Sequence, residues 1–171
     1  MTVKALPGFT PSQSVFEYCV AAAQDELVYP GILQCISITG YSVGGLIGTH
    51  VSPGATEEDL QNTFQILRSG AGRNFDTWYV VGNFTKHFTY IKVPWWNTAR
   101  KIKSALRKNL SKSAKYWAFN TDTIEGSGSG FGIDVIATRG ASGVEIAYAK
   151  ASRQGDKPRQ PISSLVDLSA I

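Results

Sequence analysis

The order of its strand and helix patterns is the feature that most restricts how this chain can fold. Two pairs of strand-like runs, 32–39 with 43–51 and 133–138 with 144–149, are each joined by a glycine-containing turn, as in β-hairpins. Further strand patterns lie at 77–81, 87–93 and 116–120. Since helical patterns fall between them without a regular βαβ rhythm, we expect the α+β class, with mixed β-sheets, sandwich-like, and flanking helices.

Three helices are expected, at 10–23, 56–70 and 97–110. Thr10 followed by Gln13 and the run Thr56-Glu57-Glu58-Asp59 both have the pattern of a helix N-terminal cap. The run Tyr29-Pro30-Gly31 is typical of a turn and is expected to end the first unit.

Length and composition indicate one globular domain. The chain has 171 residues, of which 43% are hydrophobic and 18% charged, with a formal net charge of +4. We expect a single domain over 1–171, with 1–9 and 151–171 as loosely attached tails and 126–132 as a mobile glycine loop. No apolar run is long enough to cross a membrane, and the N-terminus lacks the apolar core of a Sec signal peptide.

Cysteine and histidine are scarce. The chain contains Cys19, Cys35, His50 and His87, and their spacing matches no Cys-x-x-Cys pattern. The sequence therefore predicts neither a disulfide framework nor a metal site, and it predicts no cofactor. Cys19 is expected to be a small apolar residue of the core.

Cys35 and His50 form the candidate catalytic pair. Cys35 lies at one end of the first predicted hairpin, and His50 lies near the far end of the partner strand. An antiparallel turn between Gly40 and Gly44 brings those ends together, so that the imidazole can take the thiol proton and hold a thiolate–imidazolium pair. The alternative is an inert core cysteine beside a surface or capping histidine.

This arrangement resembles the glutamine deamidase superfamily that contains CheD, the catalytic domain of the cytotoxic necrotizing factors and the Burkholderia lethal factor. The resemblance rests on Gln34-Cys35-Ile36-Ser37-Ile38 and Gly48-Thr49-His50-Val51, with the Cys-to-His gap of the necrotizing factors, and on the order of elements over 28–150. The family usually has glycine directly before the cysteine, where this chain has Leu33-Gln34.

The resemblance implies a nucleophile at Cys35 and a base and acid at His50. Tyr29 occupies the place of a threonine that orients the histidine in CheD and the lethal factor, so its hydroxyl is the third candidate. A main-chain carbonyl, as in the necrotizing factors, is the alternative. The expected substrate is a glutamine of a partner protein, which a bacterial effector or toxin, made in the cytoplasm and then secreted or delivered into a host cell, would convert to glutamate.

Two other functions remain open. One is a different Cys-His hydrolase, such as a transglutaminase or a peptidase. The other is a non-enzymatic module, because Arg100 to Lys115 is rich in Lys and Arg and is flanked by Trp95, Trp96 and Trp117. Basic residues beside aromatic rings suit nucleic acid or an acidic protein.

Overall fold

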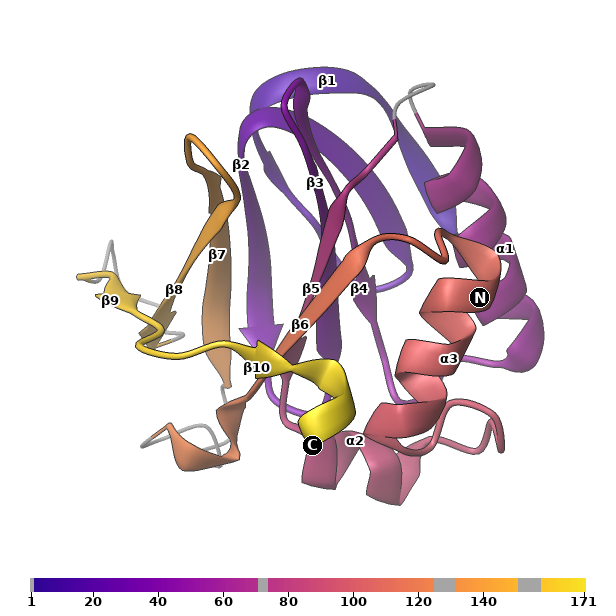
Figure 1. The fold of residues 1–171 in the computed structure, drawn as a ribbon. Coiled ribbons are helices and arrows are strands. Elements are labelled where there is room, and N and C mark those ends of the chain that lie inside the picture. The colour runs from indigo at the N-terminus through magenta and orange to yellow at the C-terminus, as the bar shows by residue number, and fades with distance from the viewer. Residues whose placement is uncertain (1, 71–73, 125–131, 151–157) are drawn as a thin grey trace.

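The computed structural model describes residues 2–70, 74–124, 132–150 and 158–171, and it confirms the α+β class (Figure 1). The strands are β1 (Lys4–Ser14), β2 (Cys19–Ile32), β3 (Ile36–Ser42), β4 (Gly45–Val51), β5 (Thr77–Gly82), β6 (Lys115–Asn120), β7 (Ile133–Arg139), β8 (Val144–Lys150), β9 (Gln160–Pro161) and β10 (Val166–Asp167). The helices are α1 (Glu57–Ser69), α2 (Phe84–Tyr90) and α3 (Ala99–Asn109). No helix in the described part of the chain is both long and apolar enough to span a membrane.

The described strands form one mixed sheet in the order β10-β6-β5-β3-β4-β2-β7-β8-β9, with β1 paired to β2. The β1–β2 and β5–β6 pairs are parallel, and the other pairs are antiparallel. Both predicted hairpins, β3–β4 and β7–β8, are present.

Strand β2 belongs to two layers of this sheet. Its segment Val20–Ala23 pairs with β4, whereas Glu26–Ile32 pairs with β7, so the sheet folds over along β2. Contacts across the fold confirm that the layers face each other: the Tyr79 hydroxyl of β5 accepts a hydrogen bond from the Val144 amide of β8 at 3.2 Å. A hydrophobic core fills the space between these layers.

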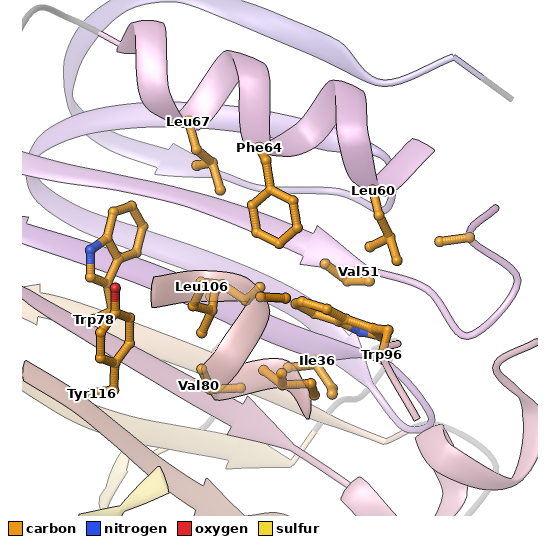
Figure 2. Close-up of a cluster of buried hydrophobic side chains, with 14 of the residues drawn as sticks. Ile36, Val51, Leu60, Phe64, Leu67, Trp78, Val80, Trp96, Leu106 and Tyr116 are labelled. Atoms are coloured by element: carbon orange, nitrogen blue, oxygen red, sulfur yellow. The ribbon is translucent and has the colours of Figure 1, made fainter. Parts of the chain in front are cut away.

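The second core lies between the sheet and the helices. Figure 2 shows Leu60, Phe64 and Leu67 of α1 pointing toward Trp96 and toward the sheet. Helix α1 starts as predicted, because Thr56 and Asp59 form a reciprocal capping box. Helix α3 is capped by the Thr98 side chain, which accepts a hydrogen bond from the Lys101 amide at 3.2 Å.

The helix predicted over 10–23 is absent, and β1 and β2 occupy this region. Thr10 and Gln13 do contact each other, at 2.9 Å, but within a strand whose register shifts between Thr10 and Ser12. Val20–Ala23 is buried throughout because both faces of β2 are covered there. A strand buried on both faces lacks the alternation of apolar and polar residues by which a strand is usually recognised. Its apolar residues then also fit the spacing of a buried helix face.

Two other local predictions were wrong. Tyr29-Pro30-Gly31 does not end a unit but forms an irregularity inside β2, where Gly31 has a φ of 67° and its amide donates to Asp134 Oδ1 at 2.8 Å. The strand predicted at 87–93 is absent, because α2 extends to Tyr90 and residues 91–93 belong to neither a helix nor a strand. The Asn83 side chain caps this helix, and its buried residues, Phe84 and His87, are three apart.

The segments near the two ends of the chain, 2–9 and 158–171, contain strands. Lys4 to Phe9 belongs to β1, and Val3 is 7% exposed. Near the C-terminus, β10 pairs with β6, and Leu168 is fully buried against the helical core. Residues 151–157 and most of the predicted glycine loop, 125–131, lie outside the described residues.

Candidate active site

The β3–β4 hairpin brings Cys35 and His50 together. Ser37 pairs with His50 in the antiparallel register, and Cys35 lies two residues before Ser37 at the same end of the hairpin. The Cys35 sulfur, a ring nitrogen of His50 and a carboxylate oxygen of Glu17 all lie within 4.8 Å of one another. We call these three residues the Glu17–Cys35–His50 cluster.

Glu17 is the member that sequence reasoning missed. It lies in the link between β1 and β2, which forms a bridge to β4 at His50. Tyr18 has a φ of 61°, a rare conformation for a residue with a side chain, and its amide donates to the His50 carbonyl at 3.2 Å. No local signal predicts this placement, because it depends on the β1–β2 link crossing the end of a distant hairpin.

The surroundings of His50 fix its tautomer. Its Nδ1 lies 3.2 Å from the Val15 carbonyl oxygen, which can only accept, so Nδ1 carries the proton. Its Nε2 is therefore the basic nitrogen, and it is buried without a hydrogen-bond partner among the described residues. Burial lowers the pKa of His50, although the Val15 carbonyl and Glu17 oppose this, so the resting ring is a neutral base.

Tyr29 lies beside His50 but does not orient it through its hydroxyl. That hydroxyl lies 2.6 Å from Thr39 Oγ1 and donates to the Ile38 carbonyl at 3.2 Å. The Tyr29 and His50 rings meet edge to face, with centroids 6.5 Å apart. The main-chain carbonyl of Val15 thus occupies the orienting position, and Tyr29 supports the ring by packing.

Cys35 is a neutral thiol in this structure. Its Sγ donates to Glu17 Oε1 at 3.4 Å. Burial, followed by the charge and hydrogen bond of Glu17, raises the pKa of Cys35 to about 12, and hydrogen bonds from Ser52 and the Gln34 backbone only partly offset this. The expected thiolate–imidazolium pair is therefore not the resting state, and the proton must pass to His50 during attack.

A buried hydrogen-bond chain holds the loop before Cys35. His87, which is fully buried, donates from Nδ1 to the Gln34 carbonyl at 2.9 Å and accepts at Nε2 from Trp96 Nε1 at 3.2 Å. Burial lowers the pKa of His87 to about 4, so this ring is neutral and both of its nitrogens are used. The chain fixes the Gln34–Cys35 peptide and, with it, the direction of the Cys35 amide.

The cluster opens to solvent through Glu17. Cys35 is 5% and His50 is 2% exposed, whereas Glu17 is exposed. A surface hollow of about 640 Å³ is lined by Trp78 and Lys115, but it lies near the opposite end of β3. Because Cys35 is almost enclosed, a group that reacts with its sulfur must be narrow.

The fold and the cluster define a small α+β domain with a Cys-His pair at the end of a β-hairpin. Comparison of the chain with protein-family models, curated proteins and solved structures finds no match.

Proposed function

We propose that this chain is a cysteine-dependent protein-glutamine deamidase, in which Cys35 is the nucleophile and His50 is the base and acid. The observation that carries the proposal is the orientation of His50. The Val15 carbonyl binds the proton on Nδ1 and leaves the Nε2 lone pair free, within a cluster that includes the Cys35 sulfur. A base held in this tautomer by an acceptor is what thiol activation requires.

The chemistry proceeds in two acyl-transfer steps. His50 Nε2 takes the thiol proton as Cys35 Sγ attacks the side-chain amide carbon of glutamine, and the carbonyl oxygen becomes an oxyanion that backbone amides stabilise. The intermediate collapses as His50 returns the proton to the leaving nitrogen, which gives ammonia and a thioester. Water, deprotonated by His50, then attacks the thioester, and glutamate and the free thiol are formed.

Burial of the cluster supports a side-chain amide as substrate. Since Cys35 and His50 are almost enclosed, a slender side chain such as glutamine reaches them more easily than a backbone amide does. The exposed Glu17 carboxylate at the mouth stabilises the imidazolium that forms during attack. We propose that the substrate is a folded protein of a host cell and that the chain acts there as a bacterial effector or toxin.

The test uses a eukaryotic cell extract in heavy-oxygen water. We expect the wild-type chain to convert particular glutamines to glutamate that carries the heavy oxygen, as read by mass spectrometry. Cys35→Ser should abolish this, and the matched variant Cys19→Ser should retain it. Glutamine conversion that is the same with Cys35→Ser as with the wild type would contradict the proposal.

Adding a primary amine to the assay distinguishes a deamidase from a transglutaminase. A deamidase releases its thioester to water, so the glutamate yield changes little when the amine is present. A transglutaminase transfers the acyl group to the amine instead, and the modified glutamine then carries the mass of the amine.

A binding function on α3 is the second candidate. Arg100, Lys103, Arg107, Lys108 and Lys112 line one surface hollow of about 490 Å³. A binder of this kind should ignore Cys35→Ser and lose affinity when these charges are reversed, with a steep dependence on salt. Lys103 is paired with Asp167 at 2.7 Å, which reduces the free positive charge of this face.

A further inference from the structure

The three side chains of the cluster are also the ligand types that zinc prefers. Zinc is bound in proteins by thiolate sulfur, imidazole nitrogen and carboxylate oxygen, at about 2.0–2.3 Å. Ligand atoms of a tetrahedral zinc site are then about 3.5 Å apart. Cys35 Sγ and Glu17 Oε1 are 3.4 Å apart, and all three ligand atoms lie within 4.8 Å of one another, so only small rotations of the side chains separate this cluster from a three-ligand site.

His50 is held as a metal-bound histidine is usually held. Ligating histidines generally donate their second ring N–H to a carbonyl or carboxylate, which fixes the ring and its tautomer. The Val15 carbonyl does this at Nδ1, and the buried Nε2 has no hydrogen-bond partner among the described residues. The unpartnered lone pair is an observation independent of the acidic residue, and it points to an electrophile in the cluster.

The charges balance around a divalent cation. The Cys35 thiol releases its proton to solvent as the metal–sulfur bond forms, and Glu17 is a carboxylate. With a neutral His50, two negative ligands offset the two positive charges of the ion, so the buried site carries no net charge. No oxidant or reductant is needed.

We propose that the Glu17–Cys35–His50 cluster binds zinc, with solvent at the fourth position, and that zinc binding reversibly blocks the thiol. Glu17 is exposed and gives the ion a route to the two buried ligands. The same three atoms cannot serve a metal and a nucleophile at once. The sequence did not predict this site because Glu17 is 18 residues from Cys35, and the two meet only through the bridge between the β1–β2 link and β4.

Cobalt(II) is the probe, because it takes zinc sites and a cobalt–thiolate bond gives a charge-transfer absorption. We expect one cobalt ion to bind per chain and to give a charge-transfer band. The band should disappear when zinc is added, because zinc displaces the cobalt. Glu17→Gln, a change at an exposed residue, should weaken binding at least tenfold. Cys35→Ser should remove the band, whereas the control Cys19→Ser should leave it intact.

Two results would overturn the proposal. One is a cobalt complex without a thiolate band, and the other is cobalt binding by Glu17→Gln and Cys35→Ser that is as tight as binding by the wild type. Circular dichroism of each variant shows whether it has folded. The readout is independent of deamidation, so loss of the metal proposal leaves the enzymatic one standing. Conversely, a chain that binds cobalt but deamidates nothing refutes only the enzymatic proposal.

Discussion

Replacing Glu17 with glutamine removes the negative charge beside the Cys35 thiol and keeps an oxygen that can accept its hydrogen bond. The two residues are 3.4 Å apart, and Glu17 raises the pKa of Cys35 in addition to the larger effect of burial. We therefore expect Glu17→Gln to lower the pKa of Cys35. Burial remains, so the thiol should still titrate above an ordinary cysteine.

The size of the effect follows from the distance. Two unit charges 3.4 Å apart interact by about 1.2 kcal/mol when water screens them fully, and by more when they are partly buried. Because one pKa unit corresponds to about 1.4 kcal/mol, this minimum raises the thiolate fraction roughly eightfold at a pH below the pKa. Glu17 is exposed, so the water-screened value applies best.

The assay is alkylation by iodoacetamide over a series of pH values, with Cys19 and Cys35 quantified separately by mass spectrometry. Cys19, whose sulfur is not part of the cluster, is the internal reference. We expect the Cys35 rate, relative to Cys19, to rise roughly eightfold in Glu17→Gln near pH 8. An unchanged or lower relative rate would show that Glu17 does not control the thiol and would refute this electrostatic reasoning.

Three further predictions concern stability. Gly48→Ala should lower the free energy of unfolding in urea by about 3 kcal/mol, because the new Cβ would collide with the Tyr29 hydroxyl; an unchanged midpoint would contradict this. Trp96→Phe should cost about 2 kcal/mol in the same assay because His87 Nε2 loses its buried donor, and Trp95→Phe, a control at a half-buried ring, should cost less. Between pH 6.5 and 4, His87 is protonated in the unfolded chain but stays neutral in the native chain. The free energy of unfolding should therefore fall by about 3 kcal/mol on acidification, and a flat profile in thermal melts would contradict this.

Local patterns were sufficient for the β3–β4 hairpin and for α1. The hairpin is defined by strand-forming runs around a glycine turn, and its register alone brings Cys35 and His50 to one end. Helix α1 has its capping box at Thr56 and an apolar face at helical spacing. The proximity of Cys35 and His50 was therefore predictable from a short stretch of chain.

The rest of the cluster was not predictable in this way. Glu17 and the Val15 carbonyl come from the β1–β2 link, which depends on parallel pairing of two bent strands and on the positive φ of Tyr18. The same strands were mistaken for a helix because Val20–Ala23 is buried on both faces. The spacing of apolar residues along a strand depends on whether one or both of its faces are buried. It is therefore misleading for a strand in which this changes from one part to the next.

Strand β2 ties the two layers of the sheet into one cooperative unit. Val20–Ala23 and Glu26–Ile32 pair with different layers, so neither layer can unfold without removing a neighbour of the other. The amide protons of β4 and β7 should consequently exchange with solvent through one shared opening event. The candidate active site takes Glu17 from the link just before β2 and Cys35 from the link just after it, so both residues are anchored to the ends of this shared strand.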